Sequence, residues 1–261
     1  MKGGKLKHGD YSTLAKYYVY RPNYSKLVLK ALALYVDAFS HVFKIADIGA
    51  GTGKLTEQLL ELGLEGYAIE PNDEMRKVGI ELLGNSKNFS WISGSAEHTG
   101  LADSSVDWVV MASSFHWTDS TKALKEFYRI LKPEGFLTIM WNPRDIENSD
   151  LEWWVEKRIK GLRPNLKRVS SGAKHQTKNW GEILISGKIF RDLIFVESPH
   201  VEIVTRERYL NIWKSVNDIQ VQLGFKKFKL LIDEIKKKIF HLEKIKVVYN
   251  TRAWTAQSVK P

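Results

Sequence analysis

Hydrophobic residues between positions 44 and 141 gather in short runs, separated by longer segments in which apolar residues recur at helical spacing. The runs predict five buried strands, at residues 44–48, 66–70, 89–93, 106–112 and 136–141. Leu55, Leu59 and Leu62 illustrate the spacing that predicts a helix between two strands. This alternation predicts an α/β fold: a doubly wound, mostly parallel sheet with helices on both faces.

The segment from 10 to 37 is helical in pattern and rich in tyrosine. Pro22 interrupts it, so we expect two short helices that meet at Arg21-Pro22. The segment can simply pack on the core, but its tyrosines and Arg21 are more than a packing helix needs. We therefore expect residues 1–40 to form a helical lid.

The pattern loosens after residue 142. It predicts a helix at 151–159, a polar loop at 161–178, one strand or a strand pair at 190–205 kinked at Pro199, a mostly helical stretch at 207–238 and a last strand at 247–256. Before the fifth strand, residues 132–135 predict a turn. With no repeats or evident linkers, we expect a single domain, 1–261, in which 143–245 partly forms a cap over the substrate.

The 261 residues include no cysteine. Disulfides, a cysteine nucleophile and thiolate metal sites are therefore excluded, and the sequence shows no convincing metal-ligand cluster. No run of about 18 apolar residues occurs, so we expect no membrane partner. Residues 1–8 lack the apolar core of a secretory signal, and we expect a cytoplasmic protein.

The formal net charge of +10 raises the prospect of an anionic partner, although lysine-rich surfaces commonly only keep a protein soluble. The densest basic patch, between Lys226 and Lys238, lies on an amphipathic helix. Its expected buried side consists of Leu230, Leu231, Ile235 and Ile239. We interpret its lysines as a solvated face.

The segment 46–55, Ala-Asp-Ile-Gly-Ala-Gly-Thr-Gly-Lys-Leu, predicts a strand end, a glycine turn and a helix start, which suits a ligand lying on the backbone. A nucleoside-triphosphate loop would need glycine at Ile48 and a hydroxyl at Leu55. A dinucleotide turn counted from Gly49 would need glycine at Lys54. The spacing matches Gly-x-Gly-x-Gly, which suits S-adenosylmethionine (SAM).

Glu70 ends the second predicted strand, 19 residues after Gly51. A carboxylate there faces the ligand crevice of an open α/β sheet and can accept both hydroxyls of a ribose. It suits either a dinucleotide or SAM, so it does not separate them, and it can also be an ordinary surface carboxylate.

Several further motifs follow in order along the chain: Ala68-Ile69-Glu70-Pro71-Asn72-Asp73-Glu74-Met75, Gly94-Ser95-Ala96-Glu97, Ser105-Val106-Asp107-Trp108-Val109-Val110, Phe115-His116-Trp117-Thr118-Asp119 and Phe127-Tyr128-Arg129-Ile130-Leu131-Lys132-Pro133-Glu134-Gly135. Together with segments 46–53, 20–24 and 249–252, they cover most of the chain. On these motifs the sequence resembles class I SAM-dependent methyltransferases of the small-molecule kind (methyltransferase type 11), and within them trans-aconitate methyltransferase-like enzymes.

The resemblance implies seven strands, the last antiparallel, with SAM across the ends of the first four and S-adenosylhomocysteine as product. It implies that Glu70 binds the ribose and that Arg21 clamps the SAM carboxylate, although Arg21 could be an ordinary surface arginine. The other cofactor-binding positions that it implies are Gly49, Ala50, Gly51 and Gly53 in the turn, Pro71, Met75, Ser95, Ala96 and Glu97 around adenine, and Ser113 and Phe115 near the methionine.

The implied reaction is an in-line displacement at the sulfonium methyl group of SAM. A carboxylate acceptor needs no base, whereas a hydroxyl or amine does, and His116 is the candidate base because it follows the fourth strand. Otherwise His116 shapes the pocket or is structural. The expected acceptor pocket comprises Tyr11, Tyr18, Tyr20, His116, Trp117 and Trp153, with Trp180 a weaker candidate.

Three functions remain open. The first is O- or N-methylation of a small, acidic or amphipathic acceptor, possible also at a carboxylate, by a monomer or homodimer. The second is nucleic-acid methylation, motivated by the net charge. It is disfavoured because residues 112–115, Ala-Ser-Ser-Phe, lack the Asn/Asp-Pro-Pro-aromatic motif of amino-group methylases. The third is a catalytically silent SAM-binding protein.

Overall fold

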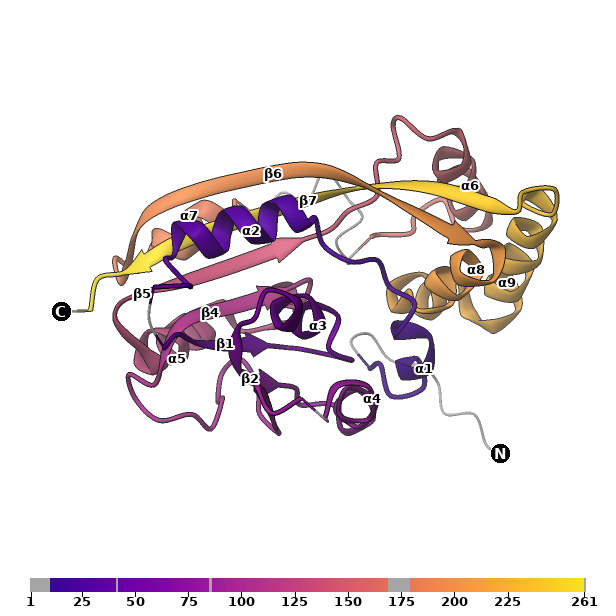
Figure 1. Cartoon of the computed structure of the whole chain (residues 1–261). Coiled ribbons are helices and arrows are strands. Elements are labelled where there is room, and N and C mark those ends of the chain that lie inside the picture. Colours follow the sequence, from indigo (N-terminus) through magenta and orange to yellow (C-terminus); the bar gives the residue numbers. More distant parts are fainter. Residues whose placement is uncertain (1–9, 41, 85, 169–178, 261) are drawn as a thin grey trace.

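The computed structural model of the chain describes residues 10–40, 42–84, 86–168 and 179–260 (Figure 1). The expectation for residues 1–8, the first nine residues of the expected lid and most of the expected loop at 161–178 lie outside these ranges.

Within the described residues, seven strands form one sheet in the order β3-β2-β1-β4-β5-β7-β6. The strands are β1 (Lys44–Ile48), β2 (Glu65–Ile69), β3 (Phe89–Ile92), β4 (Val106–Ala112), β5 (Leu131–Trp141), β6 (Phe190–Thr205) and β7 (Lys244–Ser258). The first five are parallel, and β7 runs antiparallel to both β5 and β6. The α/β fold with an antiparallel last strand is thus confirmed.

The helices follow the expected order, and two short helical elements are added among the described residues. They are α1 (Ala15–Tyr18), α2 (Lys26–Tyr35), α3 (Lys54–Glu61), α4 (Asp73–Leu83), the 3₁₀ turn η1 (Phe115–Trp117), α5 (Ser120–Ile130), α6 (Asp150–Leu162), α7 (Trp180–Ile185), α8 (Arg206–Lys214) and α9 (Asn217–Lys238). The short α7 was not expected from the sequence, because only its tryptophan and two spaced aliphatic residues mark it.

The sheet is covered on both faces by apolar side chains at helical spacing. On one face, Leu29 and Leu32 of α2 and Leu59 of α3 belong to one buried cluster with strand residues. On the other face, Phe127 and Ile130 of α5 belong to a second cluster, which α7 also joins. Burial of these faces drives the doubly wound arrangement.

A third buried cluster forms the core of a cap made by α6, α8 and α9 and the adjoining ends of β6 and β7 (Figure 1). Leu231, Ile235 and Ile239 of the basic helix are buried there, as expected. Leu230 is not: 47% of its surface is exposed. The helix is interrupted at Gly224, where φ is 72°. The expected assignment of Leu230 to the buried side was therefore wrong.

Two strands have irregular features. The expected turn at 132–135 lies within β5 as a bulge, since the pairing with β4 shifts between Val106 and Trp108 and Glu134 has a φ of 56°. Residues 190–205 form one long strand, the first of the two expected alternatives. Pro199 has no amide hydrogen to donate, and it is tolerated because β6 is the last strand of the described sheet order and has a neighbour on one side only.

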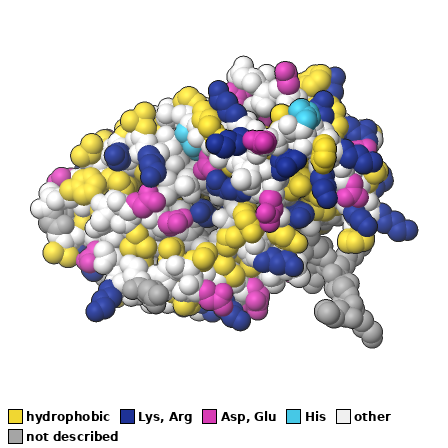
Figure 2. Space-filling model, turned by 45° about the vertical axis from the view of Figure 1, so that its right-hand side comes forward, with side chains coloured by type: hydrophobic (Ala, Val, Ile, Leu, Met, Phe, Trp, Pro, Cys, Tyr) yellow, Lys and Arg dark blue, Asp and Glu magenta, His cyan; other side chains and the backbone are white. Residues whose placement is uncertain are grey.

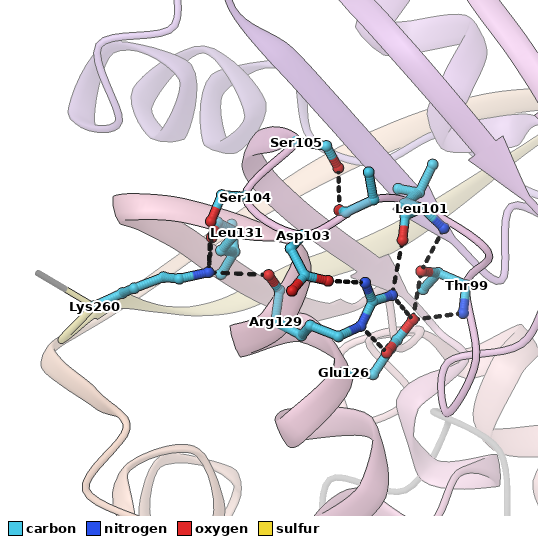
Figure 3. A network of polar contacts seen from close by, with 10 residues as sticks. Thr99, Leu101, Asp103, Ser104, Ser105, Glu126, Arg129, Leu131 and Lys260 are labelled. Atoms are coloured by element: carbon cyan, nitrogen blue, oxygen red, sulfur yellow. Dashed lines mark hydrogen bonds and ion pairs between the residues drawn. The ribbon is translucent and has the colours of Figure 1, made fainter.

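A polar network beside α5 ties down the C-terminal end of the described chain (Figure 3). Lys260 Nζ donates to Ser104 Oγ and to the carbonyl oxygens of Arg129 and Leu131. Arg129 also donates to both oxygens of Glu126. Burial acts to raise the pKa of Glu126, but donors from Arg129 and Thr99 outweigh it and lower the pKa to about 2.

Charged side chains of both signs are interspersed on the cap side of the molecule (Figure 2). In the part of the chain that the structure describes, no helix combines the length and the apolar character needed to cross a membrane.

Candidate functional site

The glycine turn joins β1 to α3 at the carboxyl end of the sheet. The amides of Gly49 and Ala50 both donate to the carbonyl of Ile69, at 2.8 and 3.1 Å, which fixes the turn to β2. Gly49 has a φ of 70°, and a Cβ there would lie 2.7 Å from Ser114 Oγ. Only glycine fits this close approach of the turn to the loop after β4.

A cavity of about 390 Å³ lies over this turn and is called the large cavity below. Its volume falls in the range typical of sites for small organic ligands. It lies where β1, β2 and β4 end and where the N-terminal segment crosses the sheet edge (Figure 1). The residues expected from the sequence that line it are Tyr11, Tyr18, Gly49, Ala50, Gly51, Glu70, Pro71, Met75, Ser95, Ala96, Glu97, Ser113 and Trp117.

Glu70 is held rigidly at the wall of the large cavity. One carboxylate oxygen accepts from the amide of Gly51 at 2.9 Å and the other from the amide of Asn72 at 2.8 Å. Burial raises the pKa of Glu70, and these two hydrogen bonds partly offset the rise. Because each carboxylate oxygen can accept two hydrogen bonds, both keep capacity for a pair of ligand hydroxyls.

Asp47 also lines the large cavity, and the sequence reasoning missed it as a site residue. Its Oδ2 accepts from Thr56 Oγ1 at 2.6 Å, while its Oδ1 is buried with no hydrogen-bond partner among the described residues. Burial is the main reason that the pKa of Asp47 rises to about 7. The available clue was an acid inside an apolar strand, two residues before the first glycine.

The adenine side expected from the resemblance is built from the loops after β2 and β3. Met75 and Ala96 line the large cavity and are almost fully buried. Ser95 Oγ accepts from the amide of Glu97, and a carboxylate oxygen of Glu97 accepts from the amide of Asp119. These contacts hold a small apolar wall beside polar backbone, which suits a flat nitrogenous ring.

Three aromatic side chains, Tyr11, Tyr18 and Trp117, cover one side of the large cavity. Tyr11 meets Tyr18 edge-on, with ring centroids 5.4 Å apart, and meets Trp117 at 6.4 Å. Two hydrogen bonds hold this N-terminal segment: Asn72 Nδ2 donates to Ser12 Oγ, and Asn217 Nδ2 donates to the carbonyl of Asp10. The segment therefore bridges the cofactor side of the cavity and the cap.

A second cavity of about 50 Å³, called the small cavity, adjoins the large one. Tyr18, Tyr24, Lys54 and Ser113 line both, so the two are neighbours that share a wall. Arg21 lines the small cavity rather than the large one, with its guanidinium carbon 5.1 Å from the centre of the Tyr18 ring. The remaining residues of the small cavity are Pro22, Asn142, Pro143, Arg144, Arg168, Val216 and Tyr249.

Two residues of the fourth-strand motif lie elsewhere than expected. The η1 turn directs Phe115 inward, where it is 1% exposed and packs on Phe127 and Trp180. His116 is not part of the lining of either cavity, and its Nδ1 accepts from Trp141 Nε1 at 3.3 Å. The turn brings Trp117, one residue later, to the cavity instead.

Gly53, Tyr20, Trp153 and Trp180 also lie away from both cavity linings. A Cβ on Gly53 would be 2.6 Å from Leu83 Cδ1, so this glycine serves packing against α4. Tyr20 and Trp180 pack on hydrophobic clusters, and Trp153 is half exposed beneath Lys157. Sequence motifs alone do not distinguish such packing positions from pocket positions.

The sheet order, the reversed last strand and a cavity between a Gly-x-Gly-x-Gly turn and an acidic residue after β2 are features of class I SAM-dependent methyltransferases. The residues at the site suit that cofactor. SAM carries a ribose, which the two oxygens of Glu70 can accept, and an ammonium, which suits the unpartnered oxygen of Asp47.

Comparisons with known proteins give the family. Residues 46–139 match the family model described as "Methyltransferase domain". Two methyltransferases of Schizosaccharomyces pombe, both named as uncharacterised, are each 33% identical to this chain. One alignment covers 82% of this chain and 81% of the relative, and the other covers 87% and 86%. The chain therefore belongs to the class I SAM-dependent methyltransferases, and SAM is its cofactor.

Other relatives match over shorter lengths. An uncharacterised methyltransferase of Mycobacterium tuberculosis is 42% identical over 102 residues, which span 39% of this chain and 41% of that relative. Among solved structures, a protein of Anaeromyxobacter dehalogenans assigned as a type II methyltransferase has a TM-score of 0.66 at 19% identity, covering 92% of this chain and 99% of that one.

A phosphoethanolamine N-methyltransferase of Haemonchus contortus, solved with S-adenosylhomocysteine, has a TM-score of 0.53 at 18% identity, covering 95% of this chain and 57% of that one. At such identities the two structures support the fold.

Proposed function

We propose that this chain transfers the methyl group of SAM to an oxygen or nitrogen of a small-molecule acceptor. The observation that carries the proposal is the pair of adjoining cavities, one over the glycine turn and one beside it, lined in part by residues of the cap. SAM supplies an activated methyl group, so the protein needs mainly to orient the acceptor and exclude water. Alignment of that kind is worth effective molarities of roughly 10⁵–10⁸ M.

We assign the cofactor contacts as follows. Glu70 accepts from the ribose hydroxyls, Asp47 from the ammonium, and Arg21 donates to the carboxylate of SAM. Tyr11, Tyr18 and Trp117 close over the cavity and keep water out. Residues 1–40 would then act as the lid and 143–245 partly as the cap, within one domain.

His116 fits a structural role better than that of a base, because it lines neither cavity. When Nδ1 accepts from Trp141, the proton of a neutral imidazole sits on Nε2, which then cannot take a proton from an acceptor. We expect H116N to lower kcat by less than tenfold and to leave the shape of the pH–kcat profile unchanged. A hundredfold loss with disappearance of the acidic limb would identify His116 as the base.

On the resemblance to trans-aconitate methyltransferase-like enzymes, we propose more narrowly that the acceptor can be a carboxylate. A carboxylate acceptor would need no general base, and in the described residues neither cavity is lined by a histidine. The competing nucleic-acid function draws support from the net charge, but basic and acidic side chains are interspersed on the face shown in Figure 2.

Two measurements test the proposed function. Calorimetry should detect SAM binding, and label from methyl-labelled SAM should appear in at least one member of a metabolite panel. Transfer of label to RNA, together with a salt-sensitive gel shift at micromolar protein, would favour the nucleic-acid function. Tight SAM binding without turnover on any acceptor would indicate a catalytically silent protein.

A further inference from the structure

Arg144 is a buried arginine that the proposed cofactor contacts do not use. It follows β5, and its backbone forms an isolated bridge with Tyr249 of β7. Its side chain is only 9% exposed, and its guanidinium carbon lies 4.1 Å from the centre of the Trp213 ring. Stacking on the cap core fixes the direction of this guanidinium.

The guanidinium of Arg144 has an ion-pair partner but keeps an open edge for hydrogen bonding. Arg144 Nε lies 3.3 Å from a carboxylate oxygen of Glu152, whose other oxygen accepts from the hydroxyl of Tyr209. Arg144 Nε and Nη2 are both buried, and neither has a hydrogen-bond partner among the described residues. The hydroxyl of Tyr249 is also buried without such a partner. Both residues line the small cavity.

Two other cations that line the small cavity are paired with carboxylates. Arg168 is compensated by Glu156 and Asp218. Lys54 pairs with Glu57 at 2.9 Å. Arg21 has no ion pair with any described residue. It lies beside Tyr18, which lines both cavities, and its proposed partner is the carboxylate of a SAM molecule bound in the large cavity. An oxyanion from the acceptor is the ligand chemistry that would satisfy the open edge of Arg144 and the Tyr249 hydroxyl.

The size of the small cavity limits what can enter. A volume of about 50 Å³ is on the order of a few water positions, which suits a carboxylate or phosphate head rather than a ring. The remainder of such a molecule would extend past Tyr18 and Ser113 into the large cavity.

We propose that the small cavity is an oxyanion subsite in which Arg144 Nη2 and the Tyr249 hydroxyl hold a carboxylate or phosphate of the methyl acceptor. The inference rests on the proposed function and narrows the acceptor class. The held oxyanion is an anchor, because oxygen lone pairs engaged by a guanidinium are poor nucleophiles. The acceptor is therefore bifunctional: an anionic end in the small cavity and a nucleophilic atom directed toward the methyl group.

The test is calorimetry on protein saturated with S-adenosylhomocysteine, titrated with malonate, with inorganic phosphate and with neutral malonamide. We expect malonate or phosphate to bind at least tenfold more tightly than malonamide. The comparison of the first two distinguishes a carboxylate-selective from a phosphate-selective subsite. Y249F removes one hydroxyl and should weaken anion binding about tenfold, the effect of losing a hydrogen bond to a charged group.

The double variant R144Q/E152Q removes both charges of the buried pair and so avoids leaving a lone buried carboxylate. It should abolish measurable anion binding. The matched control is R158Q, which removes an arginine of the same helix as Glu152 that pairs with Glu234 outside both cavities. It should bind anions like the parent protein.

Affinity for S-adenosylhomocysteine, measured in parallel, distinguishes a failure of the oxyanion subsite from a failure of the proposed function. It should be unchanged in all three variants, and its absence in the parent protein would overturn the proposed function. The subsite is overturned if malonamide binds as well as the anions, if the parent protein binds neither anion, or if Y249F binds them undiminished. Should R144Q/E152Q fail to fold, the Y249F result decides.

Discussion

Replacement of Glu70 by alanine is expected to weaken SAM binding by about 10²–10⁴-fold. Each hydrogen bond to a charged group contributes about 1.5–3 kcal/mol, and the proposed ribose contact has two. The loss is expected in the dissociation constant measured by calorimetry, with little change in the far-ultraviolet circular dichroism spectrum, because the glycine turn is also held by the carbonyl of Ile69.

Glutamine should be nearly as damaging as alanine at this position. Both oxygens of Glu70 accept from backbone amides, those of Gly51 and Asn72. The NH₂ group of glutamine would therefore face an N–H donor on one side. The matched control is E61Q, which removes an exposed carboxylate of α3 that pairs with Lys26. An E70A protein that binds SAM within threefold of the parent would contradict the assignment of Glu70.

Replacement of Asp47 by asparagine should remove both tight SAM binding and its pH dependence. In the free protein the pKa of Asp47 is raised to about 7, chiefly by burial. A bound ammonium favours the ionised carboxylate. Below pH 7 the proton must therefore leave on binding, and the affinity of the parent protein should fall up to tenfold per pH unit. In D47N it should be weak and flat between pH 5.5 and 7.

The Asp47 carboxylate should favour SAM binding but lower the stability of the protein without SAM. The folded protein binds the Asp47 proton more tightly than the unfolded chain, so ionisation of this buried group destabilises the fold as pH rises from about 4 to about 7. We therefore expect D47N to have a higher Tm than the parent protein at pH 8, where the carboxylate is charged.

The matched control is D73N, which neutralises an acid that is 83% exposed. A lower Tm for D47N at pH 8, or an unchanged pH dependence of SAM affinity, would show that the carboxylate is not desolvated as inferred.

Local pattern was sufficient for the strands and for the glycine turn. Continuous apolar runs mark strands buried on both faces, and alternate glycines mark a turn with positive φ. The bulge at 132–135 was not predictable, because a Pro-Glu-Gly sequence has the same composition in a turn between elements as in a bulge within one strand. Leu230 was misplaced because it lies about 100° around the helix from Leu231, outside the face that Leu231, Ile235 and Ile239 share.

The site was predicted where one short motif supplies the geometry and missed where distant segments meet. Asp47 looked like one more strand residue, since its burial depends on Thr56 and the cavity above it. Phe115 and His116 were expected at the site, but the 3₁₀ turn η1 directs both away from the cavities and brings Trp117 to the large cavity instead. Arg144 and Tyr249 come together only because β7 inserts beside β5, a long-range pairing that no local pattern encodes.

The attachment of the N-terminal segment has a consequence for the order of events in turnover. Among the contacts of that segment are two neutral hydrogen bonds, from Asn72 to Ser12 and from Asn217 to the carbonyl of Asp10. Such bonds contribute about 0.5–1.5 kcal/mol each, so releasing them requires no disruption of the sheet. The Asn72 amide also donates to Glu70, the proposed ribose-binding carboxylate, so we expect a bound cofactor to favour reattachment of the segment. On that basis we expect the methyl donor to bind before the acceptor and its product to leave last.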